Sequence, residues 1–105
     1  MPSINFYLKD PNSSKETRIY LQTLYAGTKC KYTTNLRALP DEWNFKKQRV
    51  KSTNRSSNSK LNRELQRIEN NASICYNNLI TGGTQFTPEN FRLALHNSLH
   101  QTKSI

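Results

Sequence analysis

The sequence predicts an α+β fold: a three-stranded antiparallel β-meander with one long helix packed on one face, plus a short C-terminal helix. Three observations lead to this prediction. The first third of the chain alternates between apolar and polar residues, which is the period of half-buried strands. Residues 58–80 carry apolar side chains three or four positions apart, as an amphipathic helix does. A Thr-Pro pair at 87–88 marks the start of a second helix.

Three stretches show the strand pattern, at about residues 4–9, 17–25 and 28–34. A polar turn and an Ala-Gly pair separate them, and connections this short join antiparallel neighbours. One face of the predicted sheet is apolar and consists of Ile4, Phe6, Leu8, Ile19, Leu21, Cys30 and Tyr32. This face needs a cover, because a short three-stranded sheet alone is only marginally stable.

Residues 35–55 show no regular period, and we predict an irregular segment there. Pro40 is placed to begin a single helical turn. The large apolar residues of the segment are expected to anchor it beneath the sheet edge. They are Leu36, Leu39, Trp43 and Phe45.

The long helix is predicted from Ser57 or Asn58, which are good N-caps, to about Ile80, before Gly82-Gly83. Its apolar stripe is the natural cover for the sheet, and it consists of Leu61, Leu65, Ile68, Ala72, Cys75, Tyr76 and Leu79. The second helix is expected at about 87–100. We therefore divide the chain into a domain at residues 1–83 and a short helix with a tail at residues 84–105.

The charge of the chain points to a polyanionic partner. The 105 residues carry a formal net charge of +9, and most of the Lys and Arg residues lie before residue 56. Hydrophobic residues make up only 33%, so the core must be small, which excludes a large enzyme cleft. No apolar run approaches the roughly 18 residues of a membrane span. We expect a cytoplasmic protein without a membrane partner.

The polar face of the predicted sheet is the strongest functional signal. Alternation places Arg18, Gln22, Lys29 and Lys31 on one surface, and a two- or three-stranded ribbon fits the major groove of DNA. Arginine pairs with guanine and glutamine with adenine, while tyrosines contact thymine methyl groups or phosphates. The alternative is an ordinary solvated face that carries lysines for solubility.

A basic run follows within the irregular segment, and it consists of Lys46, Lys47, Arg49, Lys51 and Arg55. Such residues make phosphate contacts, which position a protein on DNA without reading its sequence. A run of this kind is also compatible with a solvated loop.

Catalysis and metal binding find little support. The seven acidic residues form no obvious catalytic pair, and the sequence has neither a nucleophile elbow nor a phosphate-binding glycine loop. His96 and His100 have helical spacing but no acidic companion, so we expect no metal. Cys30 and Cys75 lie on predicted core faces and are interpreted as small buried residues. We expect no cofactor and no enzymatic activity.

The order of these pieces resembles a known family. The segments Ile4–Asp10, Arg18–Leu21, Tyr25–Thr34 and Leu39–Lys51 are similar to the N-terminal arm-binding region of Bacteroides-type tyrosine recombinases, the integrases of phages and conjugative transposons. The resemblance covers about residues 3–80. It is most specific at Trp43-Asn44 and Lys46–Val50, which follow a basic meander and precede a long helix.

The resemblance implies sequence-specific binding of double-stranded DNA at the arm-type attachment sites of an integrase, in support of DNA integration and recombination. The sheet residues implied to read DNA are Tyr7, Arg18, Tyr20, Gln22, Lys29, Lys31 and Thr33; those implied to clamp phosphates are Lys46, Lys47, Arg49 and Lys51. The catalytic and core-binding domains of such an enzyme have no room in 105 residues, so residues 84–105 would lead toward an absent core-binding domain. Other recombinase protomers, on nucleoid DNA, would be the protein partners.

Two other functions are compatible with the residues. The two helices would suit a protein-interaction module that mediates multimerisation of a recombination complex, with the basic face only solvated. A small sheet backed by a helix also suits an RNA-binding module, although the aromatic signature of the common RNA-binding sheet is missing.

Overall fold

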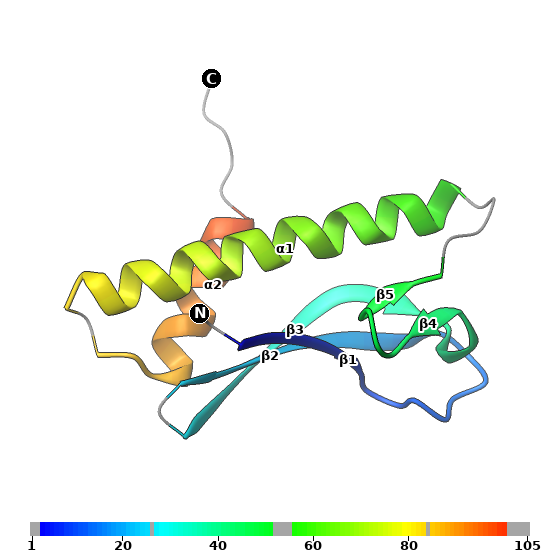
Figure 1. Cartoon of the computed structure of the whole chain (residues 1–105), viewed down its shortest axis with the longest axis horizontal. Helices are drawn as coiled ribbons and strands as arrows, with labels where there is room; N and C mark the ends of the chain where they lie inside the picture. Colours follow the sequence, from blue (N-terminus) through cyan, green and yellow to red (C-terminus); the bar gives the residue numbers. More distant parts are fainter. Residues whose placement is uncertain (1–2, 26, 52–55, 84, 101–105) are drawn as a thin grey trace.

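The computed structural model describes residues 3–25, 27–51, 56–83 and 85–100, and it has two layers. One layer is a three-stranded sheet of β1 (Ser3–Leu8), β2 (Thr17–Tyr25) and β3 (Thr28–Ala38). The other is the long helix α1 (Ser56–Thr81), which lies across one face of the sheet (Figure 1). The α+β prediction is confirmed. No helix in these described ranges is both long and apolar enough to cross a membrane.

The sheet is the predicted antiparallel meander, with the strand order β1-β2-β3. Phe6 pairs with Leu21, and Leu21 pairs with Tyr32, so apolar residues of all three strands share one row. These three side chains are buried under α1. Gly27 takes a φ of 81° in the turn between β2 and β3, a left-handed conformation that glycine adopts without strain.

Strand β3 is longer than predicted, because it continues through a bulge to Ala38. Along β2 the pairing moves from Arg18 to Tyr20, while along β3 it moves from Arg37 to Thr33. Thr34 stabilises this irregularity: its Oγ1 donates to the Ile19 carbonyl at 2.6 Å and accepts from the Leu36 amide at 3.1 Å. The shift is an even number of residues, so the strand keeps the same faces on both sides of the bulge.

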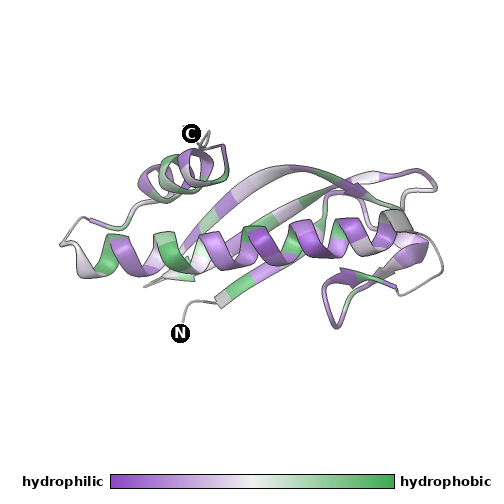
Figure 2. Ribbon diagram, turned by 90° about the horizontal axis from the view of Figure 1, so that it is seen from above, coloured by the Kyte–Doolittle hydropathy of each residue, from purple (hydrophilic) through white to green (hydrophobic). Residues whose placement is uncertain are grey.

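Helix α1 covers the sheet with the predicted stripe. Leu65 and Ala72 are fully buried at its centre, and the face turned away from the sheet is largely hydrophilic (Figure 2). The helix ends at Gly82-Gly83 as expected. A Cβ on Gly82 would lie 2.8 Å from the Asn78 carbonyl oxygen, and Gly83 has a φ of 75°, so both glycines suit a helix C-terminus.

Helix α2 (Pro88–Leu99) packs against α1 and β3 at one end of the sheet (Figure 1). The predicted cap is confirmed, since the Thr87 hydroxyl accepts a hydrogen bond from the Asn90 amide at 3.0 Å. Phe91 and Leu95 are fully buried. Helix α2 is therefore anchored in the same core as the sheet and α1.

The segment predicted to be irregular contains regular structure. A 3₁₀ turn, η1 (Pro40–Glu42), confirms the expected helical turn, and a two-stranded hairpin follows it, made of β4 (Trp43–Asn44) and β5 (Arg49–Val50). Trp43 is buried as predicted. The prediction for Phe45 was wrong, because this side chain is 57% exposed in the hairpin turn. Arg55 lies outside the described residues.

The core predicts unequal effects for two truncations on α1. Leu65→Ala should lower the free energy of unfolding by about 2–5 kcal/mol, because it removes a fully buried side chain between helix and sheet. Ile74→Ala on the same helix removes a side chain that is 56% exposed, and should change this free energy by at most about 0.5 kcal/mol. Urea unfolding followed by circular dichroism measures both. Equal losses would contradict the described packing of α1.

Candidate nucleic-acid interface

The face of the sheet turned away from α1, here called the outer face, collects all seven sheet residues predicted to read DNA. Cross-strand pairing aligns them in rows. Asn5, Gln22 and Lys31 form one row, next to a row of Tyr7, Tyr20 and Thr33, while Lys29 lies opposite Leu24. Because this face has no second layer over it in the described part of the chain, these side chains are available for a ligand.

The two tyrosines of the outer face form a fixed aromatic pair. The Tyr7 and Tyr20 rings meet edge to face, with centroids 5.5 Å apart, and the Lys31 ammonium lies 4.5 Å from the centroid of the Tyr20 ring. Desolvation, with a smaller contribution from Tyr20, raises the pKa of the Tyr7 phenol above its usual 10.0. The phenol therefore keeps its proton at neutral pH and can donate a hydrogen bond to a phosphate or a base.

A third row, beyond the tyrosines, carries three positive charges. Arg18 pairs with Arg37 across the bulge, and the Lys9 amide donates to the Arg18 carbonyl at 2.9 Å. The three side chains line a shallow hollow with the carboxylates of Asp10 and Glu16. Within the described ranges, neither carboxylate comes within ion-pair distance of the three cations. Three cations against two carboxylates leave this hollow with a net positive charge, which favours an anion.

Arg37 was missed by the sequence prediction, which ended the third strand at residue 34. Strand alternation keeps Arg37 on the same face as Thr33, and the bulge places it opposite Arg18, where an unshifted register would place Asn35. The alternation of the sequence continues through Asn35 and Arg37 and was the available signal. Lys9 was on the predicted polar face but was not predicted to contact DNA.

The basic run divides into two groups in the structure. Lys46 and Lys47 are exposed in the hairpin turn, where the Asn44 Oδ1 accepts hydrogen bonds from both amides, at 3.0 and 2.9 Å. Lys51 is exposed directly after β5, and its amide donates to the Glu42 carbonyl at 2.7 Å. These three ammonium groups remain available to phosphates.

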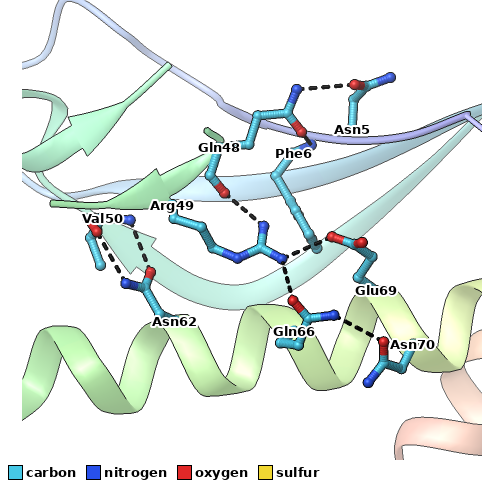
Figure 3. A network of polar contacts seen from close by, with 9 residues as sticks. All are labelled: Asn5, Phe6, Gln48, Arg49, Val50, Asn62, Gln66, Glu69 and Asn70. Atoms are coloured by element: carbon cyan, nitrogen blue, oxygen red, sulfur yellow. Dashed lines mark hydrogen bonds and ion pairs between the residues drawn. The ribbon is translucent and has the colours of Figure 1, made fainter. Parts of the chain in front are cut away.

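Arg49 lies on the opposite side of the hairpin and points toward α1 (Figure 3). Its Nη2 is 2.8 Å from the Glu69 Oε1 and 3.0 Å from the Gln66 Oε1. Its guanidinium carbon also lies 5.4 Å from the centroid of the Phe6 ring. These contacts join the hairpin to the core, and they leave Arg49 apart from the exposed lysines with which it was predicted to act.

The hairpin is fixed to both layers by side-chain amides (Figure 3). Gln48 binds the free edge of β1: its Oε1 accepts from the Phe6 amide at 2.8 Å, and its Nε2 donates to the Asn5 Oδ1 at 3.0 Å. On the other side, Asn62 of α1 accepts from the Val50 amide at 2.9 Å and donates to the Val50 carbonyl at 3.0 Å. Sequence reasoning did not identify these two amides.

The two histidines lie at the C-terminal end of α2, and the two cysteines are buried. The ring of His96 in α2 lies 4.3 Å from the ring of His100, the C-cap of this helix, and no group of three or more potential metal ligands occurs among the described residues. Cys30 and Cys75 are both buried, as predicted. Burial raises the pKa of both thiols above the usual 9.0, which disfavours the reactive thiolate at neutral pH.

Comparison with known proteins identifies a family. A family model described as an arm DNA-binding domain matches residues 6–92. This range extends from β1 into α2 and includes every residue proposed above for the interface. No curated protein and no solved structure gave a match.

The hairpin contacts predict a specific loss of stability. Asn62→Ala should lower the free energy of unfolding by about 1–3 kcal/mol, because both backbone groups of the buried Val50 lose their partner. Asn62→Asp should cost at least as much, since it places a carboxylate against the Val50 carbonyl. The control is Asn77→Ala, an exposed position on the same helix. If Asn62→Ala and Asn77→Ala unfold at the same urea concentration, the hairpin does not depend on this contact.

Proposed function

Because the chain belongs to the arm DNA-binding domain family, whose members are non-catalytic DNA-binding modules of integrase-type proteins, we propose that its outer face enters the major groove of duplex DNA. One observation carries this proposal. The inner face of the sheet is covered by α1 and α2, whereas the outer face presents rows of cationic, amide and phenolic side chains to solvent. These are the groups that contact base edges and phosphates.

The dimensions of the sheet support this docking. Neighbouring strands lie about 4.8 Å apart, so the backbones of β1 and β3 are separated by roughly 10 Å across the sheet. The major groove is about 12 Å wide. A three-stranded sheet with its strands running along the major groove therefore fills the groove from one sugar-phosphate backbone of the DNA to the other.

Specificity is assigned to the centre of the outer face. Arg18 and Gln22 come from β2, the middle strand, and so point toward the floor of the groove. An arginine suits the two acceptors of guanine, and a glutamine suits adenine. The residues proposed to support them with phosphate, sugar or methyl contacts are Tyr7, Tyr20, Lys29, Lys31 and Thr33. Lys9 and Arg37, on either side of Arg18, are proposed as phosphate contacts.

The biological role proposed for this module is to place a tyrosine recombinase on the arm-type attachment sites of a mobile element. The module supplies affinity and geometry, while DNA strand cleavage belongs to a separate catalytic domain. Other recombinase protomers would be its partners on nucleoid DNA. Since the family match reaches residue 92 and Phe91 and Leu95 are buried, the module we propose includes α2 rather than ending at residue 83.

The decisive experiment is a selection of random duplex DNA on the purified chain at about 150 mM salt. An enriched motif of several base pairs supports sequence-specific recognition and supplies the arm site. A pool without a motif, retained only at low salt, contradicts base reading. Absence of retention contradicts DNA binding and favours the protein-interaction module, and preference for structured RNA over duplex DNA favours the RNA-binding module.

Two substitutions on β2 test base reading. Arg18→Ala and Gln22→Ala should each remove about 1–3 kcal/mol of discrimination between the selected site and duplexes altered at one base pair. The control is Lys60→Ala, which removes an exposed side chain from α1 in the opposite layer. Dissociation constants for the site and its single-base variants measure the effect. Discrimination equal to wild type in both variants would exclude these residues as readers.

A third substitution tests the charged row. Arg37→Gln should weaken binding to all duplexes alike and make the slope of log K against log salt shallower by about 0.9, the value for one released counterion. Lys60→Gln is the matched charge control on α1 and should leave the slope unchanged. A salt titration of both variants gives the answer, and an unchanged slope for Arg37→Gln would place this residue outside the interface.

A further inference from the structure

The turn of the β4–β5 hairpin presents an aromatic ring to solvent. Among the Phe, Tyr and Trp residues whose side chains the structure describes, Phe45 alone is exposed, at 57%. Single exposed apolar residues are common on protein surfaces, so exposure alone assigns no role to it. The neighbours of Phe45 make the position unusual, because the next two residues, Lys46 and Lys47, are also exposed and both are cationic.

The conformation of this turn is fixed by three hydrogen bonds that Asn44 accepts. The Asn44 side chain accepts from the amides of Lys46 and Lys47, and the Asn44 carbonyl accepts from the Gln48 amide at 2.7 Å. Gln48 completes the turn with a φ of 57°. A side chain held on an ordered turn loses little backbone freedom when it binds a ligand, which favours binding.

The turn is also fixed relative to the outer face. Gln48 binds Asn5 and the edge amide of Phe6, while Arg49 and Val50 hold the other side of the hairpin on α1 (Figure 3). In the view from above, the hairpin projects sideways beyond the β1 edge of the sheet (Figure 2). Gln48 directly follows Phe45, Lys46 and Lys47, and it bonds to Asn5 of the outer face and to the edge amide of Phe6, so the turn is held at the β1 edge of the sheet.

The groove geometry determines what lies beside that edge. When three strands fill the major groove, the outer edge of β1 meets the wall of the groove, which is the sugar-phosphate backbone. A hairpin that extends beyond this edge crosses the backbone toward the adjoining minor groove. Lysines meet phosphates there, and an apolar ring meets the deoxyribose surface and the base edges.

We propose that the hairpin turn Phe45–Lys47 is a second DNA contact, separate from the sheet. Lys46 and Lys47 bind phosphates of the backbone strand next to β1, and the Phe45 ring packs against the deoxyribose groups at the edge of the adjoining minor groove. This inference rests on the proposed docking of the outer face. It adds an apolar contact to an interface that otherwise depends on charge and hydrogen bonds, and it explains why the turn is fixed to both layers.

The test compares two apolar truncations of nearly equal exposure. Phe45→Ala should weaken binding to the selected duplex about tenfold, as loss of an aromatic contact with nucleic acid does. Ile74→Ala, which is 56% exposed on α1, should bind as wild type does. Both variants should keep the unfolding midpoint of wild type, because neither side chain is part of the core. Fluorescence anisotropy gives the dissociation constants.

The salt dependence separates the apolar contact from the charged one. Phe45→Ala should leave the slope of log K against log salt unchanged, whereas Lys46→Gln combined with Lys47→Gln should make it shallower by about 1.8, twice the value for one phosphate. Hydroxyl-radical footprinting adds a positional readout. Wild type should protect sugars of the minor groove beside the selected site, and Phe45→Ala should lose this protection while it keeps the protection from the sheet.

The outcomes distinguish this inference from the function on which it rests. If wild type binds the selected site and Phe45→Ala binds it equally well, with the same footprint, the hairpin contact is overturned and the sheet contact stands. If wild type retains no duplex DNA, the proposed function fails as well. A loss of affinity in Phe45→Ala with wild-type salt slope and unfolding midpoint supports the inference.

Discussion

The contact between the inner face of the sheet and α1 is the interaction on which the rest of the structure depends. The chain has few hydrophobic residues, and those of the strands are concentrated on one face by alternation. Burying this face under α1, with Phe91 and Leu95 of α2 in the same cluster, forms the hydrophobic core of the described residues. The opposite face takes no part in packing this core, so it can carry charged side chains without burying them.

The β4–β5 hairpin connects these two layers at the sheet edge. A free β-strand edge exposes unpaired amides that invite pairing with another chain. Here the Gln48 side chain accepts a hydrogen bond from the Phe6 amide on β1. On the helix side, the Asn62 side chain bonds to both the amide and the carbonyl of Val50. Both contacts satisfy backbone groups that would otherwise lack partners. The hairpin therefore occupies the edge of the sheet at Phe6 and is held there between β1 and α1.

The sequence predicts the parts of this structure whose signals are local. Strand alternation, the helix stripe and the cap at Thr87 each depend on neighbouring residues, and each was confirmed. The bulge depends on Thr34 binding the Ile19 carbonyl across the strands, and the position of Arg49 depends on Glu69 in α1. Such pairings are not visible in a linear sequence. Phe45 was placed in the core because hydrophobicity alone does not show that a turn points the ring outward.

Electrostatic repulsion within the charged row of the outer face links folding to DNA binding. Lys9, Arg18 and Arg37 lie side by side, and repulsion between like charges opposes the folded sheet. On the proposed docking, a phosphate between them would remove this repulsion, so bound DNA would stabilise the fold. Added salt screens the same repulsion but also weakens phosphate binding. Salt therefore acts in opposite directions on the two properties, because the charges that oppose folding are those that favour the ligand.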